Sequence, residues 1–503
     1  MEKRVIIAIA LSLFVLLIWS ALMPKPPVVP PPPPQQTSPV EKTKQAIPAE
    51  TPRKTEELPA STIGLDSKKI TFVDSQAAIK DVIFEKYQDY RFPLKYGFFL
   101  NDNSLKFKKT ATSDNTFEFV QSDDKKRITK RFIFSNSKYE LRLEIEIQNL
   151  SQEALNFNTP LLLGVLDFAS NQMQTKFEDI TVAENDKVLH PNVHKDSIFN
   201  NLQFLAMRDR YFCAIIQPEN QGFSAFVKKV SAQESEIGLV FPDKAIQPGQ
   251  IRSEKFHIYL GPQELSTISS IKPEWSAVMY YGTFDIISQV LVHFIEFLHR
   301  LVHSWGITII LLSIFIYLLL YPLSVKQMRS MKEMQLIQPE IEKLRKLYKD
   351  NPQRLNKETI ELYRKHKVNP FSGCLPLILQ IPIFFALYQA LIRSIALKGA
   401  HFLWIKDLSE ADRLITLPVS LPLIGNEINI LPILMALGMF VQQKITAAPT
   451  TDSNTADQQK LMLIILPIVF GFVFYHMPSG LVLYWFINSS LMLAYQLRTK
   501  FAK

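Results

Sequence analysis

The sequence predicts a polytopic α-helical membrane protein with six membrane-spanning helices and one large all-β domain outside the membrane. The mean hydropathy of +0.05 is high for a soluble protein, yet 20% of the 503 residues are charged. Both facts hold only if apolar and charged residues occupy separate blocks. Several apolar blocks approach the roughly 20 residues that cross a bilayer as a helix. Another block of about 200 residues alternates apolar with polar residues, as β-strands do.

The composition excludes several other classes of protein. With two cysteines, Cys213 and Cys374, the chain is neither a disulfide-rich scaffold nor a cysteine-rich zinc protein. Its 15 glycines and 35 phenylalanines exclude collagen and a wholly disordered chain. The net charge of +9 is compatible with a nucleic-acid or a membrane-surface partner, so the positions of the charges must decide.

The first 23 residues predict an uncleaved signal anchor. Lys3 and Arg4 precede the uncharged run from Val5 to Met23, and such positive residues stay in the cytoplasm. The alternative is a cleaved signal peptide, but the run is longer than the usual apolar region and no small-x-small cleavage site follows it. Residues 24–62 contain twelve of the 32 prolines, which predicts a stiff, extended linker.

Residues 63–271 predict an extracytoplasmic domain built as one large antiparallel β sandwich. Apolar and charged residues alternate strictly from Tyr139 to Ile147, as in a half-buried strand. Turn sequences such as Gln247-Pro248-Gly249-Gln250 separate the runs. Cys213 is expected to be a buried apolar residue of this domain.

Residues 272–304 predict an amphipathic helix. Polar residues recur every three or four positions on one face, and the opposite face is apolar. Such a helix can lie in the membrane interface, although a helix packed on the β domain is the alternative. No cysteine or carboxylate pattern completes a metal site around His293, His299 and His303, so no metal is predicted.

Residues 305–503 predict a core of five further spans. These spans contain neither Asp, Glu, Lys nor Arg, and they cover 305–323, 374–392, 428–441, 461–475 and 480–497. The third and fourth are short for a hydrocarbon layer of about 30 Å. A basic helical hairpin, 326–367, has twelve Lys or Arg and six Asp or Glu, a net charge of +6. The positive-inside rule places this hairpin and both termini in the cytoplasm, and the loop 394–427 outside.

The five spans carry neutral polar residues at helical spacing. They form one stripe on the first span and one on the last, with a glutamine on the second: Ser313, Tyr317, Tyr321 and Ser324; Tyr484, Asn488 and Tyr495; and Gln380. Such groups hold helices together or line a wet cavity, and the pattern leaves both possibilities open. The sequence contains no nucleophile, metal or phosphate motif, and these spans contain no ionisable coupling residue. This argues for a binding or assembly role without a cofactor, not for an enzyme.

Four segments resemble the YidC family of membrane-protein insertases, which has relatives in mitochondria and chloroplasts. They are 369–376 (NPFSGCLP), 380–388 (QIPIFFALY), 321–323 (YPL) and 478–485 (PSGLVLYW). The order of blocks also resembles this family: anchor, large periplasmic domain, interfacial helix, basic hairpin and five-span core. The resemblance covers nearly the whole chain. The long periplasmic domain is similar to that of the Gram-negative form, in which it is a β supersandwich.

The resemblance implies an insertase and chaperone of the bacterial inner membrane. It would insert newly made membrane proteins and help them fold, alone or with the Sec translocon. A hydrophilic groove, open to the cytoplasm and to lipid, would receive the polar part of the substrate. No cofactor is expected. DNA is not an expected partner, because the basic residues lie where the topology requires them. One alternative is a transporter or channel with an accessory periplasmic domain, and another is an envelope scaffold whose β domain binds glycan.

The resemblance also suggests groove residues, with one departure from the family. The family usually carries an arginine in the groove on the span that ends Tyr-Pro-Leu, and the equivalent position here is Tyr317. Arg393 lies at the outer end of its span and does not replace that arginine. A neutral groove would be lined by Ser313, Tyr317, Gln380, Tyr484 and Asn488.

Two further expectations concern the parts outside the groove. Lys343, Arg345, Lys346 and Lys349 of the hairpin are expected to contact ribosomes or the targeting machinery, because polyanionic RNA attracts them. Packing between the two hairpin helices is the simpler use for its apolar residues. Because the β domain follows a linker, we expect most of 63–250 to be dispensable for insertion and the helix 272–304 to be required.

Overall fold

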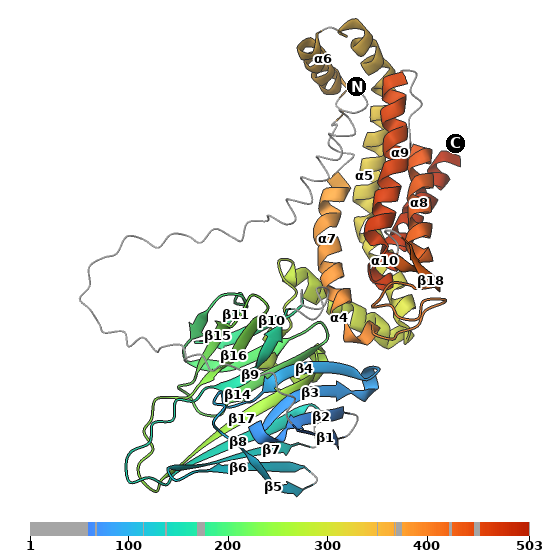
Figure 1. The fold of residues 1–503 in the computed structure, drawn as a ribbon. Helices are drawn as coiled ribbons and strands as arrows, with labels where there is room; N and C mark the ends of the chain where they lie inside the picture. The colour runs from blue at the N-terminus through green and yellow to red at the C-terminus, as the bar shows by residue number, and fades with distance from the viewer. Residues whose placement is uncertain are drawn as a thin grey trace, which may run out of the picture. The chain divides into compact units, whose positions relative to one another are not determined.

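The computed structural model describes residues 59–501 apart from 66–67, 114, 136–137, 169–176, 350, 367, 369–374, 422–424 and 447–452. The predicted anchor (1–23), most of the predicted linker and Cys374 lie outside the described residues. In chain order, the described part is a β domain followed by a helical region (Figure 1). This agrees with the predicted division into a β-rich domain and a helical C-terminal region.

The β domain contains three antiparallel sheets. The largest has nine strands in the order β11-β10-β13-β14-β17-β8-β7-β6-β5, and two four-stranded sheets have the orders β1-β2-β3-β4 and β12-β15-β16-β9. The strands are β1 (Ala60–Leu65), β2 (Lys68–Val73), β3 (Ala78–Phe84), β4 (Tyr90–Gly97), β5 (Lys108–Ser113), β6 (Thr116–Ser122), β7 (Lys126–Phe134), β8 (Glu140–Asn149), β9 (Leu161–Asp167), β10 (Asp179–Glu184), β11 (Lys187–Leu189), β12 (Ser197–Phe199), β13 (Leu202–Arg208), β14 (Phe212–Pro218), β15 (Ser224–Lys229), β16 (Glu234–Val240) and β17 (Ile251–Pro262).

Strand β8 shows how the alternating pattern specifies this domain. It pairs with β7 on one side and β17 on the other, so its backbone groups are bonded along both edges. Leu141, Leu143, Ile145 and Ile147 are buried, and the charged residues between them lie on the opposite face. Many phenylalanine rings fill the core beneath this face; for example, Phe84 stacks on Phe212 with ring centroids 4.2 Å apart. Cys213 is a free, buried thiol, as predicted.

The C-terminal region is helical. Its helices are α3 (Leu265–Ile271), η3 (Pro273–Val278), α4 (Asp285–Val302), α5 (Trp305–Leu347), α6 (Pro352–Lys365), α7 (Leu375–Ile392), η5 (Ile395–Leu397), α8 (Ile430–Thr446), α9 (Ser453–Phe474) and α10 (Ser479–Phe501). By length and composition, the stretches Trp305–Met334 and Ser479–Thr499 could each cross a bilayer. Shorter apolar helical stretches are Gln380–Ile392, Ile430–Ile445 and Leu463–Phe474. The count of six spans therefore stays a prediction.

Helix α5 joins two predicted elements. The first core span and the first half of the basic hairpin form one helix of 43 residues, with Pro322 and Pro339 inside it. The hairpin turns at Tyr348–Asn351. There, the Asn351 side chain accepts a hydrogen bond from the Arg354 backbone N–H (3.1 Å) and caps α6.

The predicted amphipathic segment divides into two parts. Its first turn, η3, packs on the β domain, where the Trp275 indole N–H donates to Gln217 (2.8 Å). Helix α4 packs on α5 and α7. In this contact, the Ser288 hydroxyl donates to the Ala386 carbonyl of α7 (3.0 Å). The apolar residues Ile286, Val290 and Leu301 of α4 stay exposed. A helix with one packed and one exposed apolar side fits the interfacial interpretation of 272–304.

The structure also contains a β hairpin that the sequence analysis missed. Strands β18 (Ile415–Leu421) and β19 (Gly425–Ile428) pair within the loop 394–427, which the charges predict to lie outside. Apolar residues alternate with Thr, Pro and Ser from Ile415 to Leu421, but Pro418 inside this run argues against a strand, because proline cannot donate a ladder hydrogen bond.

Candidate functional site

The four residues of the polar stripe on α5 differ in burial, and Ser324 is buried. Tyr321 is 39% exposed, Tyr317 is half-buried and Ser313 is fully buried. The Tyr321 ring lies 6.1 Å from that of Tyr317 and meets that of Tyr495 on α10 edge-on at 5.4 Å. The stripe is therefore accessible in its middle, at Tyr317 and Tyr321, and buried at both ends, at Ser313 and Ser324.

Ser313 and Ser324 satisfy their hydroxyl groups within α5. Ser313 donates to the Ile309 carbonyl (2.7 Å) and Ser324 to the Leu320 carbonyl (3.1 Å). Such back-bonding lets a hydroxyl sit in an apolar helix without an unpaired donor. The two tyrosines of the stripe, Tyr317 and Tyr321, remain partly exposed.

Gln380 and Tyr484 come together from two helices. The Gln380 amide of α7 donates to the Tyr484 hydroxyl of α10 (2.7 Å), and Tyr484 is fully buried. Asn488 lies one turn further along α10 and is half-buried. Since α10 also packs along α5, the five predicted groove residues lie on three helices of one cluster.

The loop 394–427 holds the beginning of α10. The Ser479 and Gly480 backbone N–H groups donate to the Glu410 and Leu408 carbonyls at 2.7 and 2.9 Å, so these donors at the start of the helix are satisfied by the loop. A Cβ at Gly480 would lie 3.1 Å from both the Leu408 carbonyl oxygen and an Ile309 methyl group. This close approach explains the glycine in the PSGLVLYW segment.

A turn of the β domain contacts the same loop. The Arg210 guanidinium donates to the Ile392 carbonyl at the end of α7 (2.8 Å) and to the Ser409 carbonyl (2.8 Å), and it pairs with Glu410 (3.1 Å). The Tyr211 hydroxyl donates to the Ser409 hydroxyl (3.2 Å). One turn, residues 209–211 between β13 and β14, thus reaches both the α7 end and the loop that receives α10. No local pattern in the sequence indicates this contact.

Arg393 is engaged with the β domain. Its guanidinium lies 3.4 Å from the Asp179 carboxylate, which also accepts a hydrogen bond from Arg208 (2.8 Å). Arg208 in turn donates to the Val278 carbonyl (2.7 Å). The cationic side chain that follows α7 is therefore used at the junction with the β domain, whereas Gln380 and Tyr484 form the polar contact between α7 and α10.

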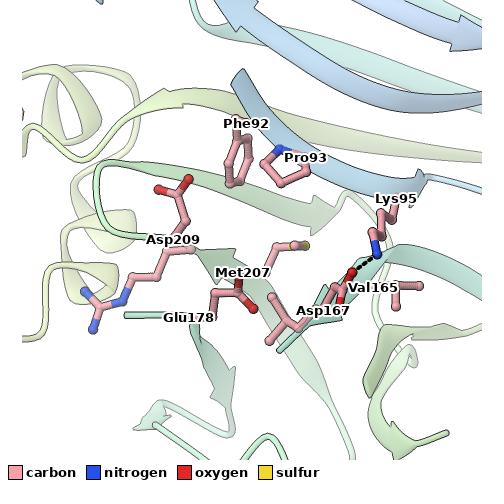
Figure 2. A pocket seen from close by; sticks show the side chains of 10 residues that line it. Phe92, Pro93, Lys95, Val165, Asp167, Glu178, Met207 and Asp209 are labelled. Carbon is pink, nitrogen blue, oxygen red and sulfur yellow. Dashed lines mark hydrogen bonds and ion pairs between the residues drawn. The ribbon is translucent and has the colours of Figure 1, made fainter. Parts of the chain in front are cut away.

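A cavity of about 220 Å³ lies in the β domain beside this junction (Figure 2). Phe92 and Met207 line it, together with the Lys95–Asp167 ion pair. Burial raises the pKa of Glu178 to about 7 and that of Asp209 to about 6. Asp209 accepts hydrogen bonds from the backbone N–H groups that follow it, so its carboxylate shapes the turn that carries Arg210. Within the described residues, no group of His, Cys, Asp and Glu could hold a metal ion.

The predicted ribosome-contact residues are exposed. Lys343, Arg345, Lys346 and Lys349 lie at the end of α5 and just beyond it. The two hairpin helices pack through Ile337 and Ile341, with Leu362 and Tyr363 against them. The hairpin thus keeps an apolar interior and a basic exterior, as predicted.

Comparison with known proteins first defines the class of protein. A family model described as "60Kd inner membrane protein" matches residues 297–502, and one described as "YidC periplasmic domain" matches residues 93–294. A membrane protein insertase YidC of Geotalea daltonii is 30% identical over 99% of this chain and 98% of its own length. The insertase YidC of Syntrophobacter fumaroxidans is 34% identical over 74% of this chain and 68% of its own. The chain belongs to the YidC family of membrane protein insertases, which are not enzymes.

Solved structures of the same family also match. An active YidC insertase crystal structure is 21% identical, covers 87% of this chain and 94% of its own chain, and has a TM-score of 0.40. YidC from Thermotoga maritima is 15% identical, covers 87% and 99%, and has a TM-score of 0.32. The family assignment rests on the sequence relatives.

Proposed function

We propose that this chain inserts nascent membrane proteins through a neutral polar groove. Ser313, Tyr317, Gln380, Tyr484 and Asn488 line the groove, which opens to the cytoplasm and to lipid and closes at the outer loop. The partial exposure of Tyr317, Gln380 and Asn488 carries the proposal, because it leaves polar side chains accessible on three helices of one cluster.

The groove lowers the cost of moving a polar segment into the membrane. An amide or hydroxyl that loses water without a new hydrogen bond costs roughly 2–7 kcal/mol. Phenol, amide and hydroxyl groups both donate and accept hydrogen bonds, so they replace part of that water. The substrate's apolar segment then enters lipid, which contributes about 0.8 kcal/mol per buried CH₂ group. With Tyr317 where the family usually has arginine, the groove attracts substrate through hydrogen bonds, not through a buried charge.

The proposed topology follows the charges. Residues 1–23 form the first span and the helical core supplies five more, with both termini in the cytoplasm and the β domain in the periplasm of a bacterial inner membrane. The chain works alone or beside the Sec translocon. Its exposed basic hairpin faces the ribosome or the targeting machinery, and α4 lies on the outer membrane surface.

Substitution of Gln380 tests the groove. Gln380→Leu removes the amide that bonds Tyr484 and leaves an apolar side chain of similar size, so insertion should fall several-fold. The matched control is Tyr388→Phe, which removes a hydroxyl from a half-buried residue of the same helix outside the proposed groove. Insertion is measured in protein-free liposomes as protease protection of a small substrate. Wild-type insertion by a stably folded Gln380→Leu protein would contradict the groove.

A further inference from the structure

The β18–β19 hairpin is apolar and exposed. Between Arg413 and Glu427 the sequence has no Asp, Glu, Lys or Arg. Ile415 is 52% exposed and Val419 is 67% exposed, although both are large apolar side chains. A soluble loop seldom keeps such residues together in water, so the hairpin needs a covering surface.

The base of the hairpin is charged and fixed. The Arg413 guanidinium pairs with the Glu427 carboxylate (2.9 Å), directly at the ends of the uncharged run. The Asp412 carboxylate accepts from the Leu431 backbone N–H (2.7 Å), and the Tyr475 hydroxyl donates to the Glu427 carbonyl (2.8 Å). The base is therefore held on the beginning of α8 and the end of α9, and the hairpin extends from a defined position.

Helix α8, which follows the hairpin in the chain, also exposes apolar side chains. That helix begins at Ile430, two residues after β19 ends, and its residues Ile433 and Leu437 are exposed. Figure 1 places β18 at the same end of the helices as α4, whose apolar face is also exposed. With 17 residues, α8 is about 26 Å long at roughly 1.5 Å per residue, which is short for a hydrocarbon layer of about 30 Å.

We propose that the β18–β19 hairpin lies in the outer leaflet of the membrane. Ile415 and Val419 contact lipid chains near the headgroups, and the Arg413–Glu427 pair stays at headgroup level. The hairpin thereby extends the lipid-facing surface of the short helix α8. Its depth is limited, because the unpaired edges of a two-stranded hairpin cannot lose their hydrogen bonds to water in the hydrocarbon core. Pro418 has no N–H and so removes one such donor from an edge.

Fluorescence quenching in liposomes tests the proposal independently of insertase activity. Single cysteines at Val419 and, as the matched control, at Lys406 are introduced into a full-length chain with Cys213→Ala and Cys374→Ser. Lys406 is an exposed charged residue of the same outer loop. Each is labelled with a polarity-sensitive fluorophore and reconstituted in liposomes of phosphatidylethanolamine and phosphatidylglycerol. Lipids carry a spin label either near the headgroup or deep in the acyl chain, and iodide is the aqueous quencher.

The expected results differ between the two positions. The label at Val419 should be quenched several-fold more by the shallow lipid than by the deep one, and should be shielded from iodide. The label at Lys406 should be quenched mainly by iodide. Equal iodide quenching at both positions would overturn the proposal, because the hairpin would then lie in water. A Val419 label reached by neither quencher would also overturn it, because protein would then cover the hairpin.

Discussion

Tyr317 is the residue on which the chemistry of the proposed groove depends most directly. A phenol offers one donor and one acceptor, and its ring tolerates lipid contact. Its half-buried position, between exposed Tyr321 and buried Ser313, fits a boundary between a wet and a dry part of the stripe. Leu319, two residues further along α5, is 63% exposed on the helical surface and provides a comparison.

Cysteine labelling distinguishes a wet groove from a dry helix contact. A single cysteine at Tyr317 should react with a small polar maleimide in intact membranes and crosslink to a stalled nascent chain, whereas one at Leu319 should react little in lipid. Tyr317→Phe should reduce insertion modestly, because it removes about 1 kcal/mol of hydrogen bonding. Tyr317→Arg should accumulate normally, since a wet site hydrates the guanidinium. Equal protection of both cysteines, or loss of the Tyr317→Arg protein, would show a dry contact.

Lys130 makes the stability of the β domain depend on pH. It is fully buried, and its side-chain Nζ donates to the Ala77 and Phe98 carbonyls at 2.5 Å. Burial lowers its pKa from 10.5 to about 7. Between these values the unfolded chain binds a proton that the folded chain does not, so the free energy of unfolding should rise with pH, by at most about 1.4 kcal/mol per pH unit.

The full chain is unfolded with urea in detergent at pH 8, 9 and 9.5. Pulse proteolysis of the β domain gives the urea concentration at which half of the domain is unfolded. Glu178 and Asp209 are ionised throughout this window, because their raised pKa values lie at about 7 and about 6. The wild-type midpoint should increase relative to that of Lys130→Met, which cannot titrate. Parallel midpoints of the two proteins across the window would show that Lys130 keeps its proton in the folded chain, so that burial does not lower its pKa.

At the scale of elements, the turn 209–211 changes the expected role of the β domain. A domain on a linker was expected to be largely dispensable for insertion. Arg210, however, holds the end of α7 and the loop that receives α10. This turn is therefore the part of the β domain that we expect to matter for insertion.

Arg210→Ala should loosen the outer closure. Two buried carbonyls lose their donor, at a cost of roughly 1–3 kcal/mol each. Hydrogen exchange should increase in residues 392–410 and in the first turn of α10, and insertion should fall. The control is Arg131→Ala, which breaks a pairing with Glu118 and Glu146 on the face of the large sheet. Unchanged exchange in 392–410 would mean that the turn rests on the loop without holding it.

The hairpin 326–367 should act through its exposed charge. Replacing Lys343, Arg345, Lys346 and Lys349 with Gln should weaken co-sedimentation with ribosomes and reduce its salt dependence, because fewer counterions are released from the RNA. A matched variant with Gln at four exposed lysines of the β domain (Lys80, Lys106, Lys187 and Lys195) should bind as the wild type does. Equal binding by both variants at low salt would leave the hairpin as a gate or lid.

At the scale of the whole molecule, the sequence predicted features that depend on local periodicity. The alternation in β8 and the apolar runs of α5 and α10 can be recognised in a short stretch of sequence. The structure has a strand at the first and helices at the other two. The β18–β19 hairpin was missed because Pro418 stands inside the alternating run of β18, and proline is rarely found within a strand. The Arg210 contact could not be predicted, because Ile392 lies 182 positions away and only the folded chain brings the two together.

The continuity of α5 has a mechanical consequence. About 39 Å of helix, at roughly 1.5 Å per residue, separate Tyr317 from Lys343, and no loop interrupts it. A force applied to the basic end of α5 would therefore be transmitted along the helix to the polar stripe. A tilt of about 5° would move one end by roughly 3 Å relative to the other. Pro322 and Pro339 cannot donate a backbone hydrogen bond to the preceding turn, so they are the places where this helix bends most easily. The width of the groove mouth, next to Tyr321, would then respond to load on the hairpin.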